Sequence, residues 1–299
     1  MKKRWIAMLL MGCLLFGLSG CGGGKDEPEQ PREEQQEEVV TPPPVEPEPA
    51  PEVEPEPVPQ EPVPGGINPL TGLPMEEEYE NNRPVAAMFN NLKAAQPQLG
   101  VSQADIIYEI PAEGGITRMV GLFQTMDGVG TLGSIRSTRT YYLEVALGHD
   151  AVLLHAGGSP DAYEKISAWK VNNIDGVRGG SNQEKVFWRD AERKKNAGYE
   201  HSLLTSGENV QGYLDSGRYE TKHAAGYGYP VEFVADGTPL NGTDANKIRL
   251  VYSQYKTGIF EYDAATGLYM VSQYGKDYVD GNTGEQDRKS TRLNSSHAT

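Results

Sequence analysis

From Ile67 onward, short apolar runs alternate with polar segments rich in turn residues. Compact apolar runs bounded by turn residues predict strands, whereas apolar positions three or four residues apart predict helices. The strands predicted before Tyr229 are Arg83–Phe89, Ala104–Ile110, Thr117–Gln124 and Asp150–His155. The predicted helices are Ser137–Gly148, Asp161–Trp169 and Leu203–Leu214. Ser159 and Pro160 suit the N-cap and first turn of the second helix.

Beyond Tyr229 the pattern changes to strands alone. Three alternating segments joined by turns are predicted strands: Lys247–Ser253, Gly258–Asp263 and Leu268–Gln273. They indicate a β-rich region over residues 229–286 that follows a first domain over residues 67–228. We expect this region to be incomplete, because Asp287 to His297 resembles one reading frame of a common sequencing adapter. Residues 287–299 are then an artefactual tail, and a natural polar tail is the alternative.

The amino terminus has the pattern of a lipoprotein signal peptide over residues 1–20. Three cationic residues precede an apolar run from Trp5 to Leu18, which is too short to span a membrane comfortably as a helix. The run ends in Leu-Ser-Gly before Cys21, which resembles a lipobox, so we expect Cys21 to receive lipid with palmitate-type acyl chains. An ordinary secretory signal with a chance cysteine is the alternative. Lipidation places the mature chain on the extracytoplasmic face of the cell membrane.

Residues 21–66 form a predicted tether between the lipid and the domain. Lys25 to Gly66 holds 13 of the 21 prolines, with 13 acidic and 2 basic residues. Such a segment buries too little apolar surface to order itself, so it is expected to be a disordered, extended spacer. A proline-rich ligand for a partner is the alternative. The net charge of −15 argues against nucleic acid and against electrostatic docking on anionic lipid.

Six motifs together resemble the YerB-like lipoproteins, a family of unknown function found largely in Gram-positive bacteria. They are Asn68–Gly72, Tyr108–Glu109, Glu113–Arg118, Gly133–Arg139, His155–Pro160 and Phe187–Asp190. The resemblance implies a mixed-sheet α/β sandwich followed by a smaller β-rich region. Two positions depart from the family pattern. Ser134 replaces an expected proline, and Lys195–Gly198 replaces an Ala-Pro-His-Asn stretch, which puts any role of that loop in doubt.

Arginines gather around a glycine-containing turn before the helix predicted at Ser137. Arg136 and Arg139 are three residues apart and are expected on one face of the first helical turn, where backbone N–H groups also favour an anion. Arg118 and Arg189 are expected to join them around a phosphate or carboxylate. The alternative is that these arginines pair with Glu109, Glu113 and Asp190 and stabilise the fold.

Two functions follow from these residues. The first is a noncatalytic, surface-tethered binding or assembly module for an anionic small molecule or cell-wall component. The second is an extracytoplasmic enzyme in which His155 or His201, with Glu109, acts as acid and base while the arginines hold the anion. One open cleft containing all of them would favour the enzyme. Arginines buried in ion pairs without a cavity would argue against both the enzyme and the anion site.

No cofactor is expected from the sequence. The spacing of the histidines matches no zinc or iron signature, so no metal ligand is assigned. The mature chain would keep Cys21 as its one thiol, because Cys13 lies within the signal peptide. No feature of the sequence indicates an oligomeric state.

Overall fold

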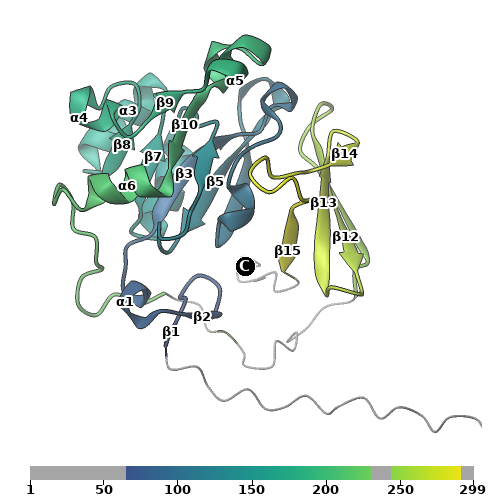
Figure 1. Cartoon of the computed structure of the whole chain (residues 1–299), viewed down its shortest axis with the longest axis horizontal. Coiled ribbons are helices and arrows are strands. Elements are labelled where there is room, and N and C mark those ends of the chain that lie inside the picture. Colours follow the sequence, from purple (N-terminus) through teal and green to yellow (C-terminus); the bar gives the residue numbers. More distant parts are fainter. Residues whose placement is uncertain (1–64, 230–232, 234–243, 291–299) are drawn as a thin grey trace, which may run out of the picture. The chain divides into compact units, whose positions relative to one another are not determined.

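A computed structural model describes residues 65–229, 233 and 244–290 (Figure 1). Cys21, the predicted tether up to residue 64 and most of the predicted tail therefore lie outside the described residues. Among the residues that are described, no helix is long and apolar enough to cross a membrane.

A five-stranded mixed sheet forms the centre of the α/β region, in the order β4-β5-β3-β7-β8. β4, β5 and β3 are mutually antiparallel, whereas β3, β7 and β8 run parallel. The strands are β3 (Val85–Asn90), β4 (Ile106–Pro111), β5 (Thr117–Phe123), β7 (Val152–His155) and β8 (Asn173–Asp175). The four strands predicted in this region are confirmed, and β8 was not predicted.

Both faces of the sheet are buried, which explains the continuous apolar run of β3. Ala86 and Met88 pack into one cluster with Leu143 of α2 (Thr140–Gly148). Ala87 and Phe89 point to the other face and pack into a second cluster with Val210 of α6 (Gly207–Leu214). The successive side chains of one strand thus supply two cores. The predicted α/β sandwich is confirmed.

Four further helices complete this region: α1 (Glu77–Glu80), α3 (Pro160–Ala168), α4 (Gly180–Glu184) and α5 (Ala191–Asn196). α3 begins as predicted, since the Ala162 backbone N–H donates to Ser159 Oγ at 3.4 Å. This bond satisfies one of the otherwise unpaired N–H groups of the first turn.

The helix predicted over Leu203–Leu214 is wrong in its first turn. Leu203–Ser206 is strand β10, which pairs with β6 (Thr131–Gly133) on one side and β9 (Trp188–Arg189) on the other. The Ser206 hydroxyl accepts a hydrogen bond from the Asn209 N–H at 3.2 Å, so Ser206 is the N-cap and α6 begins one residue later. Tertiary pairing here overrides an apolar spacing that fits either element.

The β-rich region forms a separate five-stranded sheet, whose strands confirm the three predicted ones. Its order is β11-β12-β13-β14, and β15 pairs with β13. The strands are β11 (Lys247–Val251), β12 (Thr257–Asp263), β13 (Leu268–Gln273), β14 (Lys276–Asp277) and β15 (Arg288–Ser290). β15 lies within residues 287–299, the predicted tail. A short hairpin of β1 (Gly66–Ile67) and β2 (Pro74–Met75) precedes the α/β region.

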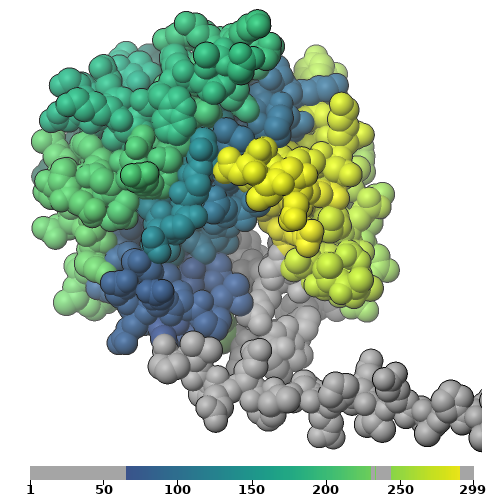
Figure 2. All heavy atoms as spheres, viewed as in Figure 1, coloured from purple at the N-terminus to yellow at the C-terminus, as the bar shows by residue number. Residues whose placement is uncertain are grey.

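Asp280, in the β-rich region, is hydrogen-bonded to backbone N–H groups of the α/β region. Its carboxylate accepts from the N–H groups of Gly100 (3.0 Å) and Ser102 (2.9 Å), residues far earlier in the chain. In the space-filling view, the yellow carboxyl-terminal residues lie against the blue part of the α/β region (Figure 2). The turn around Asp280 is thereby fixed by the α/β region.

Candidate functional site

Three of the four predicted arginines lie together. Arg118 is on β5 beside Asn90, and Arg136 and Arg139 lie in the extended segment between β6 and α2. The pKa of Arg118 is lowered, first by its burial and then by the positive charges of Arg139 and Arg136. We call Arg118, Arg136 and Arg139 the arginine cluster.

Each member of the cluster is already paired. Glu113 accepts from Arg139 Nε and, at 3.0 Å, from Nη2, and it lies 3.7 Å from Arg118 Nη2. These cations lower the pKa of Glu113, with the hydrogen bond from Arg139 as the largest cause. Arg136 donates to the Glu200 carbonyl oxygen (2.9 Å) and carboxylate (3.1 Å). The alternative prediction was that these arginines form ion pairs with Glu109, Glu113 and Asp190. Of these three carboxylates, Glu113 is a partner of the cluster, and Glu200 is a partner that was not predicted.

The predicted helix start is wrong by three residues. α2 begins at Thr140 with Arg139 as its N-cap, so Arg139 lies at the start of the helix and Arg136 lies before it. Instead, the Arg136 N–H donates to the Met88 carbonyl at 2.9 Å, and this segment continues along the end of β3. The N–H groups of Ile135 and Thr138 are likewise bonded, to the carbonyl oxygens of Leu203 and Gly157, so these three N–H groups are not available to an anion.

Arg189 does not join the cluster. It donates to the Tyr199 carbonyl at 2.7 Å, and its guanidinium lies 3.5 Å above the Tyr199 ring. Asp190 caps α5 by accepting from the Arg193 N–H at 2.7 Å. Arg189 and Asp190 therefore position the loop that leads to His201.

His201 is buried beside the arginine cluster. Its Nδ1 lies 2.8 Å from Asn90 Nδ2, and its Nε2 lies 3.5 Å from Glu200 Oε1. His201 therefore lies against the carboxylate of its sequence neighbour Glu200. Burial lowers the pKa of His201, with Glu200 opposing this shift and Arg136 and Arg193 adding to it. The imidazole is therefore held neutral more strongly than in solution.

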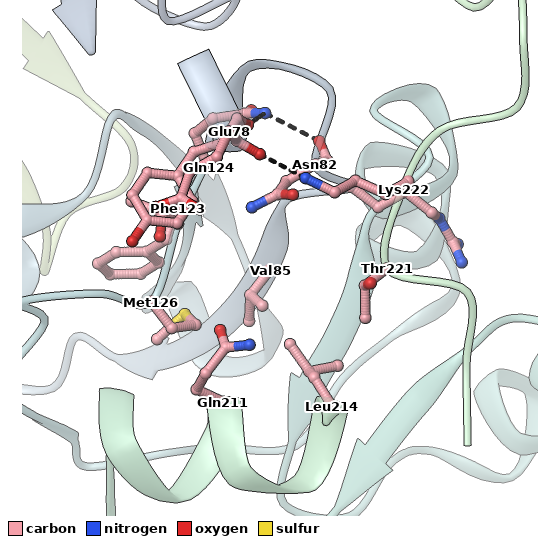
Figure 3. Close-up of a pocket in the computed structure, with 13 residues that line it drawn as sticks. Glu78, Asn82, Val85, Phe123, Gln124, Met126, Gln211, Leu214, Thr221 and Lys222 are labelled. Atoms are coloured by element: carbon pink, nitrogen blue, oxygen red, sulfur yellow. Dashed lines mark hydrogen bonds between the residues drawn. The ribbon is translucent and has the colours of Figure 1, made fainter. Parts of the chain in front are cut away.

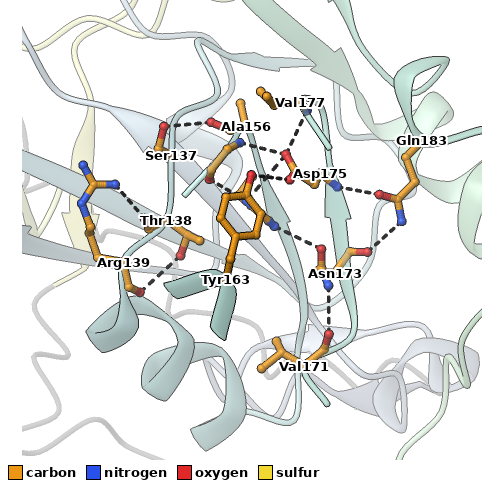
Figure 4. Close-up of polar contacts among 12 residues, drawn as sticks. Ser137, Thr138, Arg139, Ala156, Tyr163, Val171, Asn173, Asp175, Val177 and Gln183 are labelled. Carbon is orange, nitrogen blue, oxygen red and sulfur yellow. Dashed lines mark hydrogen bonds and ion pairs between the residues drawn. The ribbon is translucent and has the colours of Figure 1, made fainter. Parts of the chain in front are cut away.

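His155 and Asp175 end two parallel strands at the same edge of the sheet. His155 is fully buried, with Nδ1 2.8 Å from the Gly157 carbonyl oxygen and Nε2 3.2 Å from Asn173 Oδ1. Asp175 accepts from the N–H of Gly157 (2.8 Å) and from the Tyr163 hydroxyl (2.8 Å). Figure 4 shows Tyr163 beside Asp175. This network fixes the turn after β7, and His155 is one of its hydrogen-bonded members.

Glu109 has other partners than His201 and His155 have. Its Oε1 accepts from Asn91 (2.9 Å), from the Thr117 hydroxyl (2.6 Å) and from Lys256 Nζ (3.0 Å). Lys256 comes from the β-rich region, and burial lowers its pKa while Glu109 opposes the shift. Sequence patterns gave no sign of this pair, because its members lie in different regions of the chain.

Two cavities in the described part of the chain bear on these residues. The larger, of about 1190 Å³, lies between β4, α2 and one face of the β11–β13 sheet. Its lining is mainly apolar and aromatic, and includes Tyr108, Tyr141, Val145, Ile248, Leu250, Tyr252, Phe260 and Tyr269. We call it the aromatic cavity. A smaller one of about 190 Å³ lies beside Val85, Gln124 and Gln211 (Figure 3).

The predicted catalytic set does not converge. His155 is enclosed at the turn after β7, His201 is beside the arginine cluster, and Glu109 lines the aromatic cavity. Neither described cavity is lined by Arg118, Arg136, Arg139 or Arg189. Of the predicted catalytic residues, Glu109 alone lines one of these two cavities. Within the described ranges, no three His, Cys, Asp or Glu side chains are placed to hold a metal ion.

Comparisons with known proteins agree with the α/β fold described above. Residues 70–220 match the family described as "Protein of unknown function (DUF3048) N-terminal domain". The chain is 31% identical over 221 residues to the "Putative lipoprotein YerB" of Bacillus subtilis (strain 168), covering 73% of this chain and 63% of the relative. It therefore spans less than two thirds of that relative's length. The chain belongs to the DUF3048 family, and the relationship supports its assignment as a lipoprotein.

A solved structure supports the fold. The crystal structure of the YerB protein from Bacillus subtilis aligns with a TM-score of 0.63 at 29% identity. The alignment covers 74% of this chain and 71% of that chain. This share is larger than that of the family match over residues 70–220, and it is consistent with an α/β domain followed by a β-rich region.

Proposed function

We propose that the chain is a noncatalytic binding module, held by lipid on Cys21 at the outer face of the cell membrane, whose ligand occupies the aromatic cavity. The observation that carries this proposal is the cavity itself. Ligand sites in proteins are concave, mostly apolar and lined by aromatic side chains with a few polar groups. The cavity of about 1190 Å³ has this character, with Glu109 and Gln273 as polar groups in its wall.

The lipoprotein signal pattern that ends at Cys21 supports the proposed location at the cell membrane. The predicted tether supports a domain that reaches away from the bilayer towards the cell wall. Dispersal of His155, His201 and Glu109 over three places supports binding over catalysis, since acid–base chemistry requires such groups within reach of one substrate.

A thermal-unfolding screen of the chain tests the proposal, with wall fragments, oligosaccharides, peptides and phosphates as probes. A ligand that binds the native state stabilises it, by about 2.7 kcal/mol when the ligand concentration is one hundred times Kd, and so raises the melting temperature. Leu250→Lys places a charge in the cavity and should abolish the shift. Val251→Lys is the matched control, because Val251 is the adjacent exposed residue and lies outside the cavity lining. A shift that survives Leu250→Lys would rule out the cavity as the site.

An anion site at the arginine cluster is the second candidate, although its arginines are ion-paired and line neither cavity, because their partner carboxylates are solvent-exposed. Glu113 and Glu200 are 60% and 61% exposed, whereas the arginine side chains they hold are mostly buried. An incoming phosphate or carboxylate would displace these solvent-exposed carboxylates from the buried guanidinium groups. Phosphate and sugar phosphates should then raise the melting temperature, and Arg136→Ala and Arg139→Ala should each remove the effect. Arg218→Ala, at an exposed arginine, is the control. Retained binding in both cluster variants would eliminate this site.

A further inference from the structure

The two carboxylates that hold the arginine cluster belong to two short turns, and an exposed tyrosine lies on or against each turn. Glu200 directly follows Tyr199 in the 3₁₀ helix Tyr199–His201. Glu113 begins the turn Glu113–Gly115, and Tyr255 lies against the end of that turn. Tyr199 is 60% exposed and Tyr255 is 65% exposed. Open aromatic side chains therefore lie close to both partners of the arginine cluster.

Tyr255 comes from the β-rich region and is held in place by backbone contacts. The Ser253 hydroxyl donates to the Gly115 carbonyl oxygen at 2.5 Å and accepts from the Tyr255 N–H at 3.0 Å. Gly115 has a φ of +74°, and a Cβ added there would lie 3.1 Å from a carbon of the Tyr255 ring. The glycine permits both this backbone conformation and the close approach of the ring. These contacts fix the Tyr255 ring beside the turn that begins at Glu113.

Tyr199 is held by basic residues. Its carbonyl oxygen accepts from Arg189 Nη1 at 2.7 Å and from the Ser202 hydroxyl at 2.8 Å. The Arg189 guanidinium lies 3.5 Å from the centre of the Tyr199 ring, and Lys194 Nζ lies 5.6 Å from it. Residues 185–201 include five basic and three acidic side chains, although the whole chain has a net charge of −15. The surroundings of this ring therefore favour a negatively charged ligand.

The arginine cluster itself has an excess of positive charge. Its three guanidinium groups form ion pairs with two carboxylates, those of Glu113 and Glu200. Arg118 is 5% exposed, and its ion pair with Glu113 is 3.7 Å long, which exceeds the length of a hydrogen bond. Burial lowers the pKa of Arg118, and the positive charges of Arg139 and Arg136 add to this effect. A further negative charge at the cluster would offset this repulsion.

Displacement of the two carboxylates sets a second requirement on the ligand. Glu113 accepts from Arg139, and Glu200 accepts from Arg136, so an anion that takes their place removes these donors. A ligand with hydroxyl groups can donate to the released carboxylates while its own negative group binds the arginines. Inorganic phosphate can bind the guanidinium groups, but it has no apolar face for the tyrosine rings. A sugar with a negative group meets all three requirements.

We infer that the arginine cluster, together with Tyr199 and Tyr255, is a binding site for an anionic carbohydrate, a sugar that carries a carboxylate or phosphate group. This inference rests on the anion site proposed above as the second candidate. The negative group binds the guanidinium groups, the hydroxyl groups donate to Glu113 and Glu200, and the C–H face of a sugar ring packs on a tyrosine ring. Tyrosine suits this role because it supplies a rigid, amphipathic contact area at low entropic cost.

Isothermal titration calorimetry of the whole chain tests this inference, with four probes. Trigalacturonate carries carboxylates, glucose 6-phosphate carries a phosphate, maltotriose is neutral, and inorganic phosphate lacks a sugar. Maltotriose should bind at least about tenfold more weakly than the better of the two sugar anions, because it has no charged group for the arginines. Inorganic phosphate should bind at least about threefold more weakly than that same sugar anion, because it makes no contact with the tyrosines. The comparison of the two sugar anions distinguishes a carboxylate from a phosphate as the preferred group.

Variants of the tyrosines separate their contact with the sugar from the binding of the anion. The double variant Tyr199→Ala, Tyr255→Ala should bind the preferred sugar anion about three- to tenfold more weakly than the parent chain. It should bind inorganic phosphate as the parent does, which also shows that the site is still folded. The double variant to Phe keeps both rings and should retain most of the affinity. Tyr262→Ala is the matched control, because Tyr262 is an exposed tyrosine of β12 that packs against Tyr269.

Three outcomes would overturn the inference and leave the anion site in place. They are equal affinity for inorganic phosphate and the sugar anions, equal affinity for maltotriose and the sugar anions, and unchanged sugar binding in the tyrosine-to-alanine variant. Sugar binding that survives Arg136→Ala but is lost in Leu250→Lys would place the sugar in the aromatic cavity and would also overturn it. If neither phosphate nor a sugar anion binds, the anion site and the inference both fail.

Discussion

Lys256 Nζ lies 3.0 Å from Glu109 Oε1, and this ion pair joins the β-rich region to the edge strand of the mixed sheet. The lysine side chain is fully buried, and that of the glutamate is 10% exposed. Lys256 also donates to Gln273 Oε1 of β13. The charge is therefore satisfied on both sides of the boundary between the two regions.

Removing either member of this pair should destabilise the chain strongly. Glu109→Gln or Lys256→Met leaves one buried group without its partner, which typically costs about 3–5 kcal/mol of unfolding free energy. The double variant Glu109→Gln, Lys256→Met should lose much less than the sum, because neither charge is left alone. Urea unfolding of the four proteins measures this coupling. Strict additivity of the two single effects would show that the pair does not couple the regions.

His201 should make stability depend on pH. Its folded pKa is depressed below the ordinary value of 6.5, so the unfolded chain binds the proton more readily. The stability linked to neutral His201 is then fully present above pH 6.5 and is lost as the pH falls through the folded pKa. Unfolding free energies measured across this range should fall towards acid in the parent chain. His201→Gln should flatten that dependence, and an unchanged slope would contradict the assignment.

Most of the strands could be predicted because their apolar runs are bounded by turn residues. The failure at Leu203–Leu214 has a physical reason. Leu203, Leu204, Val210 and Leu214 are all buried, and their spacing fits one helix as well as a strand followed by a helix. The pairing of β10 with β6 and β9, which no local pattern encodes, decides between them.

The candidate site was predictable only where its parts lie close in sequence. Arg136 and Arg139 share one segment, and their meeting with Glu113 and Arg118 was anticipated in part. The bond from Gly100 to Asp280 spans 180 residues, and the aromatic cavity is walled by β4 and β11. Contacts of this range depend on how the chain folds back on itself, and spacing along the sequence does not reveal them.

Cys21 should carry the membrane attachment alone. Cys21→Ser removes the thiol that accepts lipid, and no other cysteine remains after the predicted cleavage before residue 21. Cells that express the parent chain and are grown with an alkyne-labelled palmitate should yield a labelled, membrane-bound protein. The variant should be unlabelled, and washing should release any mature form of it. Label retained by the Cys21→Ser chain would place the lipid elsewhere.

Asp175 should be among the most sensitive residues of the α/β region. It is buried at the end of β8, where its carboxylate accepts from the backbone N–H groups of Gly157 (2.8 Å) and Val177 (2.9 Å) and from the Tyr163 hydroxyl (2.8 Å). Asp175→Ala leaves buried donors unsatisfied, which should cost about 2–4 kcal/mol.

Asp175→Asn separates hydrogen bonding from volume. The amide oxygen can still accept from the two backbone N–H groups, so this variant should lose clearly less stability than Asp175→Ala. Asp127→Ala, at an exposed carboxylate, controls for the loss of a surface charge and should be nearly neutral. Urea unfolding of all four proteins gives the ranking. An Asp175→Ala chain as stable as Asp127→Ala would show that the turn after β7 is held by His155 and the surrounding packing, without the carboxylate.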